Sequence, residues 1–179
     1  MSKIAVLCND GVEEIECLTV VDFCRRAGIE VITVSVTGKR QIMGAHQIVF
    51  HADEVYADMN FDEFDGIVYP GGPGTGAMGE KSGVKELAQK FLNNGKMLAA
   101  ICAAPGMISE TGILKEKHAT GYPGCKPEGG AIWSEDAAVV DGNLVTGKGP
   151  GAAAEFAIEI IRYLAGDIKA EQIRTSTMM

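Results

Sequence analysis

One cysteine of the chain lies where a buried strand is expected to turn directly into a helix. Residues 96–101 read KMLAAI, an apolar run of strand length, and Cys102-Ala103-Ala104-Pro105-Gly106 follows without a loop. Pro105 suits the first turn of a helix, where its missing N–H is no loss. The pattern predicts a strained turn that exposes the Cys102 thiol above a sheet, with a pKa lowered by the helix N-terminus. A buried structural cysteine is the alternative, because free cysteines are usually buried.

A carboxylic acid lies on an otherwise apolar helix face. Glu16 shares its row with Val20, Phe23 and Ala27 in a helix predicted over residues 13–27. A carboxylate on a core-facing stripe is costly unless it is paired, so we expect Glu16 to be protonated by desolvation. The alternative is a glutamate on a solvated helix end, a position that suits Glu13 and Glu14 better.

A glycine-rich turn follows another short apolar run. Residues 66–69 read GIVY, and Pro70-Gly71-Gly72-Pro73-Gly74 comes directly after them. Glycines let backbone N–H groups approach a ligand with no side chain in the way, so this turn is a candidate oxyanion hole. A simple tight turn is the alternative, and the loop matches neither a phosphate-binding P-loop nor a dinucleotide fingerprint.

The elements that would position these groups alternate along the chain. Apolar, β-branched runs predict strands over residues 3–8, 29–37, 66–69 and 96–101, with short strands near 118–121, 137–140 and 144–146. Amphipathic periodicity predicts helices over 13–27, 83–94, 102–110 and 152–164, the first opened by an Asp10/Glu13 capping box. Residues 42–50 read as an extended segment, one arm of a hairpin. Alternating strands and helices predict an α/β fold whose mostly parallel sheet carries helices on both faces.

Size and composition describe one globular domain. The 179 residues are 46% hydrophobic and 22% charged, and the net charge is -8, which argues against a phosphate-backbone partner such as a nucleic acid. No apolar run reaches the roughly 20 residues that span a bilayer, and the N-terminus lacks signal-peptide character. Five cysteines without a C-x-x-C pair indicate reduced thiols in the cytoplasm and no metal site. Residues 175–179 show no pattern that would order them.

Several motifs occur together in one order through nearly the whole chain. They are Asp10-Gly11-Val12-Glu13-Glu14-Ile15-Glu16, Val21-Asp22 with Arg25-Arg26-Ala27-Gly28, Tyr69-Pro70-Gly71-Gly72, Ala99-Ala100-Ile101-Cys102-Ala103-Ala104-Pro105, and Gly149-Pro150-Gly151 leading into Glu155-Phe156-Ala157. In these motifs the sequence resembles the ThiJ/PfpI superfamily, most closely the branch of the Parkinsonism-associated deglycase and its bacterial relatives. The resemblance makes residues 1–179 a single ThiJ/PfpI-type, class I glutamine amidotransferase-like domain.

The resemblance also implies a structure and roles for the site. It implies a flavodoxin-like three-layer sandwich that forms a homodimer, with Cys102 as a reactive, oxidation-prone nucleophile. Glu16 would be the protonated glutamate that hydrogen-bonds the sulfur. Backbone groups of Gly71, Gly72 and Ala103 would stabilise an oxyanion.

The sequence departs from parts of the superfamily at its histidines. Ala103 stands where the peptidase-like branch has a histidine after the cysteine, and no His-x-Glu follows as in the glutamine amidotransferases. Tyr122 replaces a histidine that some close relatives carry near the thiol, and it is, with His46, a candidate substrate-binding residue. A histidine-assisted mechanism and a peptidase activity are therefore disfavoured. His46 aligns with a basic residue of a dimer-facing pocket, where it would help to bind an anion; a surface histidine is the alternative. His51 and His118 receive no role.

Two functions follow for the pair of Cys102 and Glu16. The first is a glyoxalase or deglycase type of hydrolase that needs no cofactor and acts on methylglyoxal or on glycated thiols and amines. The second is a redox sensor or stress-protective, chaperone-like protein that works through oxidation of Cys102. An intracellular cysteine peptidase is the third and weakest hypothesis.

Overall fold

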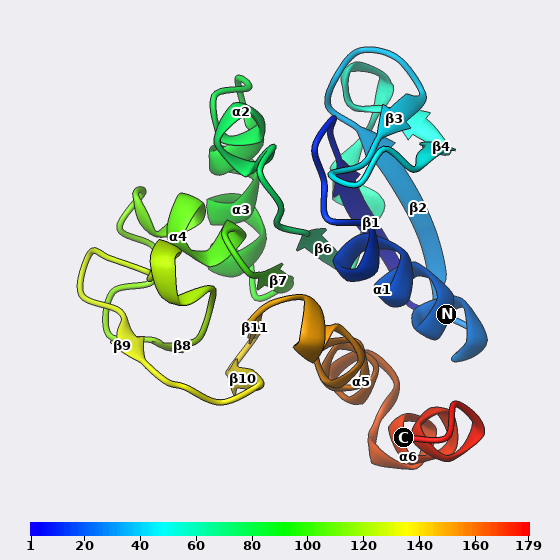
Figure 1. The fold of residues 1–179 in the computed structure, drawn as a ribbon. Coiled ribbons are helices and arrows are strands. Elements are labelled where there is room, and N and C mark those ends of the chain that lie inside the picture. Colours follow the sequence, from blue (N-terminus) through cyan, green and yellow to red (C-terminus); the bar gives the residue numbers. More distant parts are fainter.

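A central seven-stranded sheet organises the computed structural model, which describes residues 1–179 (Figure 1). All neighbouring strands pair in parallel except β10, which runs antiparallel to β11. In spatial order the strands are β10 (Ala138–Asp141), β11 (Leu144–Gly147), β7 (Met97–Ile101), β6 (Gly66–Tyr69), β1 (Lys3–Cys8), β2 (Glu30–Ser35) and β5 (Glu54–Val55). The predicted mostly parallel sheet is confirmed.

Helices cover both faces of this sheet, so the fold is a three-layer α/β sandwich. One face carries α1 (Glu14–Arg26), α5 (Ala153–Ala165) and α6 (Asp167–Ser176), and the other carries α2 (Thr75–Gly79), α3 (Val84–Asn93) and α4 (Ala104–Ser109). Alternation along β1 sends Ile4 and Val6 to the first layer and Ala5 and Leu7 to the second. Buried strands with two covered faces read as continuous apolar runs for this reason. None of the helices is both long enough and apolar enough to span a lipid bilayer.

Two small two-stranded sheets and four 3-10 turns lie outside the central sheet. A hairpin of β3 (Gln41–Met43) and β4 (Val49–His51) lies beside the start of α1, and β8 (His118–Ala119) pairs with β9 (Ile132–Trp133) in a separate small sheet. The 3-10 turns are η1 (Tyr56–Asp58), η2 (Phe61–Glu63), η3 (Pro123–Cys125) and η4 (Pro150–Ala152). The segment 42–50 therefore contains the hairpin turn with parts of both arms, where we expected one arm.

Two expectations about helix ends are wrong. The capping box does not form, because α1 begins at Glu14 with no side-chain cap and Asp10 instead accepts the Met43 N–H at 2.9 Å. The expectation for residues 175–179 fails for the first two of them, because α6 continues to Ser176; the same helix buries Ala170 and Ile173 against the core. Only two residues of α6 are buried, Ala170 and Ile173, and so few apolar positions are too weak a pattern to predict the helix from the sequence.

The strand order places three loops at one edge of the sheet. The chain leaves β1 towards β2 on one side and later returns to β6 on the other, which makes the gap between β1 and β6 a topological switch point. Ligands of open α/β sheets bind outside the carboxyl ends of the strands at such a point. The loops that follow β1, β6 and β7 meet there.

Candidate active site

Cys102 occupies the strained turn predicted from the sequence, but the expectation of an exposed thiol is wrong, because the residue is only 8% exposed and packs against the core. It follows β7 directly, and α4 begins two residues later with Pro105 in its first turn. Its φ of 64° is a left-handed value that non-glycine residues seldom adopt. Two backbone hydrogen bonds hold it there: Cys102 N–H donates to Gly147 O at 2.9 Å, and Tyr122 N–H donates to Cys102 O at 2.8 Å. The strain is therefore maintained by β11 and by the loop after β8.

Glu16 reaches the same point from the first turn of α1. Its side chain is fully buried, and Oε2 accepts the Gly71 N–H at 2.8 Å. The other oxygen, Oε1, is buried and accepts no hydrogen bond. Oε1 is thus the carboxyl oxygen left to exchange a proton with the neighbouring thiol.

Gly71 is the residue that lets the two side chains converge. A Cβ on Gly71 would lie 2.6 Å from Cys102 Cβ and 2.8 Å from Glu16 Oε2, so no larger residue fits between them. Because its N–H already serves Glu16, Gly71 is not an oxyanion donor, and that expectation is corrected. The N–H groups of Gly72 and Ala103 instead interact with the sulfur and favour its thiolate.

The Gly-rich turn is held by backbone contacts with the loop after β1. Glu13 N–H donates to Gly71 O and Gly74 N–H donates to Gly11 O, both at 3.0 Å. A Cβ on Gly72, whose φ is 107°, would lie 2.5 Å from Gly11 O. The amide of Asn9, which the sequence analysis missed, adds a bond to Gly74 O at 2.7 Å. These contacts fix the Gly72 N–H relative to Cys102.

The electrostatics of the pair differ from the sequence prediction. Burial raises the pKa of Glu16 to about 7, and the neighbouring Cys102 thiol and the hydrogen bond from the Gly71 N–H only partly offset this by lowering it. Burial, together with the charge of Glu16, raises the pKa of the Cys102 thiol to about 12. The expected lowering of this pKa is wrong, because burial of the thiol and the charge of Glu16 outweigh the Gly72 and Ala103 N–H groups that favour the thiolate. A thiolate forms here only as its proton passes to Glu16.

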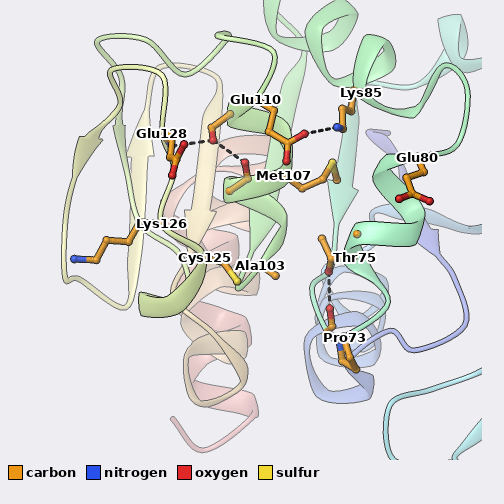
Figure 2. A pocket seen from close by; sticks show the side chains of 14 residues that line it. Pro73, Thr75, Glu80, Lys85, Ala103, Met107, Glu110, Cys125, Lys126 and Glu128 are labelled. Atoms are coloured by element: carbon orange, nitrogen blue, oxygen red, sulfur yellow. Dashed lines mark hydrogen bonds and ion pairs between the residues drawn. The ribbon is translucent and has the colours of Figure 1, made fainter.

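A cavity of about 730 Å³ opens beside this pair (Figure 2). Gly72, Ala103 and the exposed Cys125 line it, whereas Cys102 and Glu16 do not. Figure 2 shows Lys85 directed at Glu110 across the cavity rim and Lys126 pointing away from it. The remaining three cysteines, Cys8, Cys17 and Cys24, are buried in the core.

The two weaker candidate residues lie in different surroundings. Tyr122 is half-exposed and lines a groove of about 410 Å³ with Lys148 and Glu135, next to the Cys102 backbone. His46 sits on the hairpin turn, and its Nδ1 lies 2.8 Å from Glu14 Oε2. The ring is 67% exposed, which fits the alternative of a surface histidine, and the carboxylate at its Nδ1 does not favour an anion there. Glu13 and Glu14 are buried, where a solvated helix end was expected.

Comparison with known proteins gives a consistent picture. A model of the DJ-1/PfpI family matches residues 2–163. The chain is 39% identical over 178 residues to protein dj-1beta of Drosophila melanogaster, covering 97% of this chain and 95% of that protein. The crystal structure of Drosophila DJ-1beta superposes with a TM-score of 0.94 at 36% identity, over 100% of this chain and 99% of that one.

Two further relatives carry names that describe an activity. A deglycase of Pyrococcus abyssi is 31% identical over 167 residues, which cover 90% of this chain and 99% of that protein. The glutathione-independent glyoxalase DJR-1.2 of Caenorhabditis elegans is 31% identical over 175 residues, covering 96% of this chain and 93% of that protein.

Proposed function

The chain belongs to the DJ-1/PfpI family, and from that premise we propose that it is a cysteine-dependent, cofactor-independent hydrolase of the glyoxalase or deglycase type. Its substrates would be methylglyoxal or the adducts of methylglyoxal with thiols and amines. The observation that carries the proposal is the convergence of Cys102 and Glu16 on Gly71, with one carboxyl oxygen left unpaired. The relatives named deglycase and glyoxalase support it.

The first step moves one proton and forms one bond. As the sulfur of Cys102 adds to the aldehyde carbon, its proton passes to Glu16, and the carbonyl oxygen gains the negative charge. The Gly72 and Ala103 N–H groups donate to that oxyanion. Glu16 then returns the proton to the oxygen, which gives a hemithioacetal and a carboxylate.

The second stage releases a hydroxy acid. Glu16 carries the proton from the former aldehyde carbon to the neighbouring carbonyl carbon, and the hydroxyl proton passes to the neighbouring carbonyl oxygen. The two transfers convert the hemithioacetal into the thioester of a hydroxy acid. Water then cleaves the carbon–sulfur bond, and the thiol regains its proton. A carboxyl group with a pKa of about 7 suits both steps, because it accepts and donates protons readily near neutral pH.

The test is consumption of methylglyoxal by wild type, Cys102→Ala and a matched control, Cys125→Ser. We expect Cys102→Ala to lose at least about 10³-fold in kcat/KM, as removal of a nucleophile does. Cys125→Ser removes the exposed thiol of the same cavity and should retain the wild-type rate. Equal rates for wild type and Cys102→Ala would refute the proposal.

A second candidate function is that of a redox sensor or stress-protective, chaperone-like protein that works through oxidation of Cys102. Cys102 is 8% exposed, whereas Cys8, Cys17 and Cys24 are fully buried. A protonated Glu16 would donate a hydrogen bond to a sulfinate and stabilise it. Cys125 is more exposed, so Cys102 can oxidise first only if Glu16 accepts its proton and stabilises the oxidised sulfur. Intact mass and peptide mapping after graded peroxide test this: Cys102 should oxidise before Cys125, and the reverse order would remove the basis for sensing.

A homodimer in the cytoplasm is the assembly we propose. Exposed apolar residues gather on the start of α1 and on the adjoining hairpin, a surface that water disfavours; they are Ile15, Leu18, Met43, Ile48 and Val49. Five free thiols fit a reducing compartment. Sedimentation of Leu18→Glu beside wild type tests the assembly: a dimer that becomes a monomer supports it, and a wild-type chain that sediments as a monomer contradicts it.

A further inference from the structure

The cavity beside the Cys102 site is larger than the aldehyde proposed as a substrate. Gly72 and Ala103, whose N–H groups are the proposed oxyanion donors, form part of its lining. Its volume of about 730 Å³ lies in the range of pockets for drug-sized ligands, which are much larger than methylglyoxal. It shares no residue with the apolar surface proposed for the dimer. A carbonyl oxygen bound by these N–H groups would therefore lie at one wall of a cavity that has room for the molecule carrying an adduct.

Carboxylates outnumber lysines around this cavity. Its lining contains Glu80, Glu110 and Glu128, together with Lys85 and Lys126. Glu80 and Glu128 form no ion pair with a lysine, an arginine or a histidine. These two carboxylates are therefore left without a counter-charge.

Each lysine of the lining has another partner. Lys85 forms an ion pair with Glu110 across the rim, so this pair adds no net charge to the cavity (Figure 2). Lys126 points away from the cavity in Figure 2, and its Nζ lies 4.9 Å from the centre of the Trp133 ring, a cation–π distance. An anionic molecule in the cavity would meet two unpaired carboxylates and no free cation.

We propose that this cavity selects adducts whose carrier bears positive charge next to the reacting carbon, such as a cationic peptide segment, over adducts of anionic thiols. The inference rests on the function proposed for Cys102 and adds the charge of its substrate. Carboxylates that line a cleft raise the local concentration of cations, and like charges brought together suppress the wrong partner. The net charge of -8 acts in the same direction. Because Glu80, Glu110 and Glu128 are exposed, the selection should be moderate and sensitive to salt.

The test compares two peptide adducts that differ only in charge. Acetylated and amidated tripeptides with a central cysteine carry trimethyllysine or glutamate on both sides, and methylglyoxal converts the cysteine into a hemithioacetal. Trimethyllysine keeps its positive charge and cannot itself be glycated, and an excess of peptide leaves little free aldehyde. From the hydroxy acid released at low salt, we expect wild type to show a kcat/KM at least about fivefold higher for the cationic adduct. In about 1 M salt, where the Debye length is about 3 Å, the two values should converge.

The ratio of the two kcat/KM values within each variant is the readout, because a general loss of activity cancels in it. Glu80→Gln and Glu128→Gln should each lower this ratio by at least about twofold, whereas Lys85→Met, which frees Glu110, should raise it. The matched control is Glu86→Gln, which removes an exposed carboxylate that forms no ion pair and lies outside the lining. It should keep the wild-type ratio. An unchanged ratio in both Glu80→Gln and Glu128→Gln would overturn the inference.

Three further results would also overturn it, and they separate it from the function proposed for Cys102. Equal kcat/KM values for both adducts in wild type at low salt would show that the cavity does not discriminate by charge, while the proposed function would stand. Consumption of free methylglyoxal but of neither adduct would show that the cavity accepts no carrier, and again the activity would stand. Inactivity towards methylglyoxal and both adducts would refute the function and the inference together.

Discussion

Glu16 and Glu14 lie on the same turn of α1, and both are buried, yet their pKa values move in opposite directions. Burial raises the pKa of Glu16 to about 7, because one backbone N–H and one thiol are all that face it. Burial also opposes ionisation of Glu14, but hydrogen bonds from the His46 ring and from backbone N–H groups outweigh it and lower the pKa. The number of donors that each carboxyl group meets decides which one stores a proton and which one stays charged.

The functional difference follows from this contrast. A carboxyl group that titrates near neutral pH suits proton transfer to and from Cys102. A carboxylate that stays ionised suits an ion pair with the His46 ring instead. One helix turn thus supports two roles, and the changes below test their separation.

The largest effect is expected from Glu16→Gln, which removes the proton acceptor but keeps an oxygen for the Gly71 N–H. We expect kcat/KM for methylglyoxal to fall by about 10²–10⁴-fold, the usual contribution of general acid–base catalysis. In wild type kcat/KM should rise with pH through about 7, where Glu16 ionises, and the variant should lack this limb. A wild-type pH profile in the variant would assign the titration to another group.

The same variant should alter stability in a pH-dependent way. The folded pKa of Glu16 lies above its ordinary value of 4.5, so the folded chain binds the extra proton and stability falls as pH rises from about 4.5 to 7. Glu16→Gln should remove this loss and gain about 3 kcal/mol relative to wild type above pH 7. Urea unfolding at pH 5 and pH 8 measures the difference, and equal pH dependence in both proteins would contradict it.

Gly71→Ala should separate Cys102 from Glu16. The new Cβ would lie within 2.9 Å of three neighbours, so we expect a loss of roughly 1–3 kcal/mol in the free energy of unfolding. Activity should fall further than the loss of stability explains, because the proton path is displaced. Gly76→Ala is the control, since its added Cβ would meet nothing within 4 Å. Full activity of Gly71→Ala would show that the close approach is not required.

His46→Ala should weaken the other region, with a smaller effect confined to a pH window. Glu14 raises the pKa of His46 in the folded chain. The contribution of His46 to the free energy of unfolding is therefore complete below pH 6.5 and is lost as the pH rises through the folded pKa. The pKa of Glu14 is lowered in the folded chain, so its contribution to the free energy of unfolding is present above pH 4.5 and is lost at lower pH. The deficit of the variant should therefore be largest between about pH 4.5 and 6.5. Unfolding at a series of pH values checks this, and a deficit independent of pH would indicate lost packing only.

Glu13→Gln should give the smallest change, and it tests whether the two regions communicate. The charge of Glu13 is one of the causes that raise the pKa of Glu16. Its removal should shift the pH profile of kcat/KM towards lower pH without a large change in the maximum. An unshifted profile would show that the regions are electrostatically independent.

The fold class and the central pair were predictable from the sequence because they depend on local pattern. Continuous apolar runs such as residues 97–101 predict strands with two covered faces, and Cys102 must then follow at the carboxyl end. Glu16 on an apolar stripe likewise predicts a buried carboxyl group, whatever packs against it.

The remaining features depend on partners that only packing supplies. The contact of Glu16 with the Gly71 N–H, and the meeting of Glu14 with His46, join residues far apart in the chain. These contacts decide that the Cys102 pKa rises although a helix follows it, and that Glu13 and Glu14 are buried. α6 forms because α5 offers it an apolar surface. Local pattern determined which groups are buried; the tertiary structure determined which donors and charges each buried group meets, and so its protonation.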